Sequence, residues 1–105
     1  MKFLARVTLQ HEAGNMLVRD REFNKKMEMI MSEVKPEMTY FCVEHGKRTL
    51  YMFLNIEHSH ELPRVAEPFW LAMKADVEFI PAMTRDDFNK AMPQIESCAK
   101  KFSWS

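Results

Sequence analysis

The sequence has no long apolar run, no excess of one charge and no paired cysteine motif. No apolar stretch approaches the roughly 20 residues that a membrane-spanning helix needs, so we expect no membrane association. Lysine plus arginine and aspartate plus glutamate number fifteen each in 105 residues. No basic stripe is interleaved with aromatic side chains, and this excludes the usual pattern of a nucleic-acid-binding protein.

The two cysteines, Cys42 and Cys98, are far apart and form no CxxC pair. The N-terminal stretch MKFLARVTL has an arginine inside its apolar part and no small-residue cleavage site, which indicates a strand and not a secretion signal. We therefore expect free thiols and a cytoplasmic location. Apolar residues make up 47% and charged residues 29% of the chain, which predicts one globular domain over residues 1–105.

Periodicity predicts the first strand and the first helix. Residues 2–9 alternate between two faces, which is typical of a half-buried strand. The turn-like stretch HEAGN follows, with Asn15 as the expected N-cap of a helix that runs to about Val34. Lys35 precedes Pro36, which disfavours the α conformation and marks the helix end.

The stretch MTYFCVEHGKRTLYMFLNIE predicts a hairpin with His45-Gly46 as its two-residue turn. This turn fixes the register and places Tyr40 opposite Tyr51. Two sets of side chains then separate cleanly, whereas a slip of one residue would mix them. One set is Phe41, Val43, Leu50, Met52 and Leu54; the other is Tyr40, Cys42, Tyr51, Phe53 and Asn55.

The second half predicts a helix, a strand and a final helix. Apolar residues recur at helical spacing in HSHELPRVAEPFWLAMK, and ADVEFIPAM has the alternation of a strand. Thr84 and Asp87 resemble a capping box that opens a helix over about 85–102. Pro93 lies inside that helix and argues against its continuity. Cys98 belongs to the apolar stripe of the helix, so we expect it in the core.

This element order predicts an α+β, ferredoxin-like βαββαβ fold with an extra C-terminal helix and a four-stranded antiparallel sheet. Right-handed crossovers place the first and third strands in the centre. The helices cover one face, and the other face mixes aromatic, apolar and polar residues. Covering that face requires a partner, which suggests that two sheets pack as a homodimer. On this face we expect Arg6 to pair with Glu78.

The stretches KPEMTYF, AEPFWLAMKADVEF and TLQHEAGN resemble a family of small, largely uncharacterised bacterial proteins, and the similarity covers nearly the whole chain. That family is similar to the dimeric α/β-barrel superfamily. The resemblance implies a dimer whose two sheets form a barrel, with a small-molecule cavity. Cofactor-free monooxygenases, lactone isomerases and haem-handling enzymes belong to the superfamily, but none of their catalytic patterns maps onto residues of this chain.

The mixed face suggests a site for an uncharged or acidic small organic molecule. Arginine can bind a carboxylate through two hydrogen bonds, and a phenol can act as an acid. The same residues could instead serve structure, as an ion pair that fixes dimer register and as cross-strand packing. The candidate ligand-binding residues are Arg6, Tyr40, Tyr51, Asn55 and Glu78.

Four histidines complete the candidates. His11 and Asn15 could line a pocket rim at the entrance of the first helix. His58 and His60 form an HxH motif, but zinc needs further ligands, so we expect neither metal nor cofactor. A non-catalytic binding domain and a cofactor-independent monooxygenase or isomerase both remain open. In the enzyme, Glu78 or a histidine would accept a proton.

Overall fold

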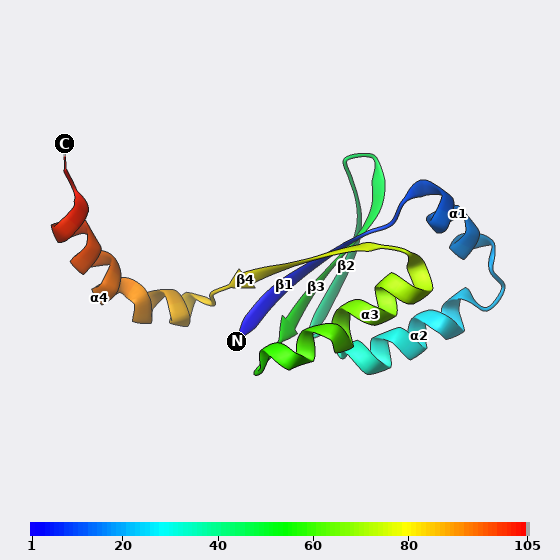
Figure 1. The fold of residues 1–105 in the computed structure, drawn as a ribbon, viewed down its shortest axis with the longest axis horizontal. Helices are drawn as coiled ribbons and strands as arrows, with labels where there is room; N and C mark the ends of the chain where they lie inside the picture. Colours follow the sequence, from blue (N-terminus) through cyan, green and yellow to red (C-terminus); the bar gives the residue numbers. More distant parts are fainter. Residues whose placement is uncertain (105) are drawn as a thin grey trace.

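Four strands form an antiparallel sheet at the centre of the computed structural model, which describes residues 1–104 (Figure 1). The strand order is β2-β3-β1-β4, so the first and third strands are central, as predicted. Each neighbouring pair is antiparallel. The bounds are β1 (Lys2–Thr8), β2 (Met38–Glu44), β3 (Lys47–Asn55) and β4 (Asp76–Ala82).

Helices connect and extend these strands. Helices α2 and α3 lie together on one side of the sheet, and α1 lies beside them (Figure 1). This is the predicted α+β arrangement, a ferredoxin-like βαββαβ unit with an added C-terminal helix. No helix of residues 1–104 is both long enough and apolar enough to cross a membrane. The bounds are α1 (His11–Arg19), α2 (Phe23–Val34), a 3-10 turn η1 (Ser59–Glu61), α3 (Leu62–Met73) and α4 (Arg85–Phe102).

The first helical segment differs from the prediction of one helix capped by Asn15. Helix α1 begins at His11, and Asn15 lies inside it. A break then separates α1 from α2, because Asp20 adopts an extended backbone and its carboxylate accepts the N–H of Glu22 at 2.9 Å. A side chain that bonds the following backbone in this way competes with the helix and starts a new one. The predicted end at Val34 is confirmed.

The hairpin register is confirmed. His45 and Gly46 both have positive φ, at 54° and 74°, as a two-residue type I′ turn requires. Tyr40 faces Tyr51 across the pair, and Cys42 faces Thr49. The two predicted faces of β3 therefore point in the expected directions.

The core lies between the sheet and helices α2 and α3. Phe69 is the largest side chain that is completely buried. The edge strand β2 departs from this pattern, because Phe41 and Val43 share the face of Leu50 yet remain exposed. The helices therefore leave the apolar edge uncovered. The buried apolar cluster is Ala5, Val7, Ile30, Val34, Leu50, Met52, Leu54, Ile56, Val65, Phe69, Met73 and Ala75.

Helix α4 spans the predicted residues without a break at Pro93. The predicted capping box is confirmed, since the Thr84 hydroxyl accepts the N–H of Asp87 and the Asp87 carboxylate accepts the N–H of Thr84, each at 3.1 Å. The expectation that Cys98 is a core residue is wrong, because Cys98 is exposed. The stripe on which it lies has no surface of the described chain to pack against.

Three carboxylates at helix starts predict a loss of stability in acid. Hydrogen bonds from Lys26 and from the N–H of Glu22 lower the pKa of Asp20. A hydrogen bond from the N–H of His58 lowers the pKa of Glu61. Hydrogen bonds from Thr84 lower the pKa of Asp87. A pKa that is lower in the folded state stabilises that state above the unfolded pKa, near 4. This stabilisation is lost as the pH falls through the lower, folded value. We expect thermal melts followed by circular dichroism to shift down by several degrees between pH 5 and pH 2.5.

The Asp20→Asn variant should show a smaller acid shift than the wild type, because it lacks the carboxylate that Lys26 stabilises at 2.5 Å. Glu28→Gln is the control, since Glu28 is an exposed carboxylate on α2, the helix that also carries Lys26. An identical acid shift in Asp20→Asn and wild type would contradict the assignment.

Candidate functional site

The face of the sheet opposite the helices, here called the open face, carries the candidate residues. Every second residue of each strand points to it, and within residues 1–104 no helix packs on it (Figure 1). Its side chains combine apolar and aromatic area with charge in the middle of the sheet. They are Lys2, Leu4, Arg6, Thr8, Met38, Tyr40, Cys42, Glu44, Lys47, Thr49, Tyr51, Phe53, Asn55, Asp76, Glu78, Ile80 and Ala82.

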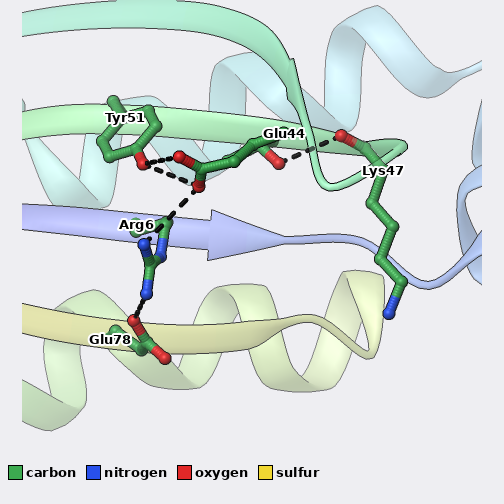
Figure 2. Close-up of polar contacts among 6 residues, drawn as sticks. Arg6, Glu44, Lys47, Tyr51 and Glu78 are labelled. Atoms are coloured by element: carbon green, nitrogen blue, oxygen red, sulfur yellow. Dashed lines mark hydrogen bonds and ion pairs between the residues drawn. The ribbon is translucent and has the colours of Figure 1, made fainter.

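Arg6 lies at the centre of this face and bridges two carboxylates, as Figure 2 shows. It stands directly across from Glu78 on β4 and from Tyr51 on β3. Its Nη2 donates to Oε2 of Glu78, which confirms the predicted pair, and its Nη1 lies 3.5 Å from Oε1 of Glu44. Hydrogen bonding to Tyr51 and to Glu78 raises the pKa of Arg6, so the cation persists throughout the accessible pH range.

Tyr51 completes the network through Glu44. Its hydroxyl donates to both carboxylate oxygens of Glu44 at 2.7 Å (Figure 2). This hydrogen bond raises the pKa of Tyr51, while the bond from Arg6 opposes the shift. The Tyr51 hydroxyl therefore serves as a hydrogen-bond donor to Glu44 and is a weaker acid than a free phenol. We call Arg6, Glu44, Tyr51 and Glu78 the Arg6 network.

The sequence prediction missed Glu44. Glu44 is the last residue of β2 and directly precedes the His45-Gly46 turn, so the sequence prediction did not assign its side chain to a face of the sheet. The signal was present, because Tyr40 and Cys42 alternate onto the open face and the next member of that series is position 44. Extending the alternation up to the turn would have found it.

Two other predicted ligand-binding residues lie at different distances from the network. Tyr40 faces Tyr51 directly across β2 and β3, and its hydroxyl donates to the sulfur of Met38 at 3.4 Å. Asn55 lies four residues beyond Tyr51, about 13 Å along the strand. It accepts a hydrogen bond from the N-terminal amine at 3.3 Å. Tyr40 thus borders the network, and Asn55 does not.

The predicted rim residues lie on the helix side of the sheet. Asn15 accepts a hydrogen bond from Arg48 at 3.1 Å, next to Gly14, where a Cβ atom would stand 2.6 Å from the Arg48 guanidinium. Arg48 points to the face opposite the network, because it alternates with Thr49 and Tyr51. His11 is exposed at the start of α1. These two residues therefore do not border the Arg6 network.

The remaining histidines form a separate feature. His58 and His60 stack with ring centroids 5.3 Å apart in the exposed loop before α3. Among residues 1–104, no group of three histidine, cysteine, aspartate or glutamate side chains is arranged to hold a metal. Neither histidine is hydrogen-bonded to the Arg6 network.

The network has a charge of −1, from one guanidinium and two carboxylates. Its exposure is intermediate, with side-chain exposures of 30% for Arg6, 32% for Glu44 and 57% for Glu78. The carboxylate oxygens retain free lone pairs toward the open side, whereas the guanidinium is already engaged on both sides. Chemically, the site presents hydrogen-bond acceptors within an apolar and aromatic surface.

Comparison with models of known protein families finds no match, and no significantly similar curated protein is found. The resemblance to small bacterial proteins of the dimeric α/β-barrel type stays a prediction. The function is therefore inferred from the chemistry of the open face.

Proposed function

We propose that the chain is a homodimeric small-molecule-binding domain of the dimeric α/β-barrel type, with the ligand held between two sheets beside the Arg6 network. The observation that carries this proposal is the network itself, an organised set of four polar side chains bordered by apolar and aromatic side chains on the same face of the sheet. A partly exposed, hydrogen-bonded polar cluster beside apolar and aromatic side chains is an arrangement typical of ligand sites. The cytoplasm is the expected location.

Dimerisation through the open face follows from its composition. Leu4, Phe53 and Ile80 lie together on one side of the network, and Tyr40 adds a half-exposed ring. Contiguous apolar patches of this kind usually mark an interface. Two identical faces can meet about a twofold axis. Sheets in direct contact lie about 10 Å apart with side chains filling the space between them, so a ligand beside the Arg6 network requires a wider separation there.

The ligand class follows from the charge and the free lone pairs. Arg6 already serves Glu44 and Glu78, so an acidic ligand would have to displace one of them. An uncharged ligand with hydroxyl donors can instead bond the carboxylates, and an aromatic ring can pack on Tyr40 and Phe53. This narrows the expected ligand to an uncharged hydroxylated aromatic molecule.

No specific observation favours the enzymatic alternative. Glu78 accepts a hydrogen bond from Arg6, so the pair would have to open before that oxygen could take a proton. No histidine within residues 1–104 joins the network. The binding domain is therefore the function that we propose.

Sedimentation velocity over a concentration series tests the dimer. We expect twice the mass of the 12.5 kDa chain. Tyr40→Arg should weaken dimerisation at least tenfold, because it adds a charge to the covered face. Leu71→Arg is the control, since Leu71 is 79% exposed on α3, which lies on the other side of the sheet. Equal dimerisation of both variants would contradict the proposed interface.

Titration with catechol tests the ligand class. In the dimer we expect saturable changes in the NMR signals of the Arg6 side chain and the Tyr51 ring, and weaker ones with benzoate. Saturable binding of benzoate without any response to catechol would contradict the ligand class.

A further inference from the structure

Helix α4 projects beyond the end of the sheet and lies beside no other element (Figure 1). It has 18 residues, and none of them is buried. Its apolar side chains nevertheless repeat at intervals of three and four, which places them on one side of the helix. This stripe consists of Phe88, Ala91, Met92, Ile95, Cys98, Ala99 and Phe102.

The shape of the chain shows that α4 is detached from the folded body. The radius of gyration is 17.7 Å, and the longest dimension is 58 Å against 29 and 21 Å for the others. A compact domain of this length has a radius of gyration of about 13 Å. The excess comes from α4, because α1, α2 and α3 pack with one another or with the sheet.

Such a helix needs a partner to persist in water. Isolated helices shorter than about 12–15 residues are marginal even when they are rich in alanine, and in proteins most helical stability comes from packing an amphipathic face. Pro93 within α4 removes one backbone donor and weakens the helix further. A capping box at Thr84 fixes its start but cannot replace tertiary packing.

We propose that α4 is exchanged between the two copies of the chain, so that its apolar stripe packs on the other subunit along the exposed edge strand β2. This inference rests on the homodimer of the proposed function. A second copy is the occupant because each chain carries both complementary surfaces, and a twofold axis then satisfies both at once.

The receiving surface is the uncovered edge strand. Met38, Tyr40, Phe41 and Val43 are all more than half exposed on β2. A sheet edge with apolar side chains invites association, and natural proteins often cover it with a helix. A groove of about 390 Å³ continues from this edge to the base of α4, along the rim of the open face. Its lining is Lys2, Glu37, Met38, Phe53, Ala82, Met83 and Thr84.

The area that α4 can cover agrees with a second copy. A helix of 18 residues is about 27 Å long and about 10 Å wide, so two reciprocal helices bury roughly 1,100 Å² in total. Together with the paired sheet faces, this reaches the roughly 1,200–2,000 Å² of stable interfaces.

Variants on opposite sides of α4 test the exchange. Ile95→Glu places a charge in the middle of the apolar stripe, and we expect its dimer dissociation constant, from sedimentation velocity, to rise at least tenfold. Ser97→Glu adds the same charge to the polar side and should leave dimerisation unchanged. Both variants keep Pro93 and the capping box and place glutamate in the interior of α4, so we expect a similar effect of the two substitutions on the helix propensity of α4.

Cross-linking separates this inference from the homodimer itself. Cys42 on β2 and Cys98 on the stripe are both free and exposed. In a mixture of Cys42→Ser and Cys98→Ser chains, no chain carries both thiols, so a short bis-maleimide can join Cys42 to Cys98 only between subunits. Mass spectrometry should find that linked peptide pair. A dimer without the link and indifferent to Ile95→Glu would overturn the exchange but keep the sheet interface; a monomer at every concentration would overturn both.

Discussion

Replacing Phe69 by alanine is expected to remove about 3–5 kcal/mol from the free energy of unfolding. The ring is completely buried between α3 and the sheet, so the substitution leaves a cavity in the centre of the core. Natural domains have only about 5–15 kcal/mol in total. The variant should therefore be close to unfolded at 37 °C. Urea unfolding followed by circular dichroism measures the change through the midpoint concentration.

Leu71→Ala is the matched control on the same helix. Leu71 is 79% exposed, so its truncation removes little buried area, and we expect less than about 1 kcal/mol. A loss of similar size in both variants would mean that the helix packs on the sheet through a different face from the one described.

Local rules were sufficient to predict the hairpin and the Arg6–Glu78 pair. A two-residue turn at His45-Gly46 leaves one register that keeps the apolar side chains together, and the pairing follows by counting. Arg6 meets Glu78 because the ferredoxin-like strand order places β4 beside β1. The hairpin register and the Arg6–Glu78 pair depend on short-range geometry and on the right-handed crossover rule. Both can be applied to a sequence alone.

The break between α1 and α2 was not visible in the apolar periodicity. It depends on the side chain of Asp20, which bonds the backbone of Glu22 and pairs with Lys26. The apolar series stops over residues 19–22, which are all charged, but one charged turn is also compatible with the exposed face of a continuous helix, so the hydrophobic pattern does not distinguish the two. Polar contacts that compete with the helix are specified by single residues and are easily overlooked.

The position of α4 could not be predicted for a different reason. An apolar stripe with Cys98 at its centre has the same sequence signature whether it packs on its own sheet or on another chain. The sequence therefore predicts the helix and its face but not its partner. The direction of α4 is set by the two-residue link of Met83 and Thr84 after β4, from which α4 projects beyond the sheet (Figure 1).

Replacing Arg6 by methionine is the second change with a large expected effect. Without the guanidinium, Glu44 and Glu78 remain on the strands that flank β1 with no cation between them. Formation of the proposed dimer would then take uncompensated carboxylates out of water, which is costly. We expect the dimer dissociation constant at pH 7 to rise more than tenfold in sedimentation velocity.

Two further variants define the cause. Arg6→Lys keeps one charge but loses the planar group that reaches both carboxylates, so an intermediate defect is expected. Arg6→Met combined with Glu78→Gln removes the cation together with one anion. The network charge then returns to −1, and dimerisation should largely recover. A dimer of wild-type strength in Arg6→Met alone at pH 7 would show that the network does not lie in the interface.

The same double variant separates the structural role of the network from ligand binding. Arg6 pairs with one oxygen of Glu78 and one oxygen of Glu44, so we expect the orientation of the two carboxylates to depend on the guanidinium. Restoring the charge balance does not restore that orientation. We therefore expect a dimer that forms normally and binds catechol at least tenfold more weakly than wild type. If both dimerisation and catechol binding recovered in the double variant, the net charge of the network alone would explain the role of Arg6. The orientation of the carboxylates would then have no part in ligand binding.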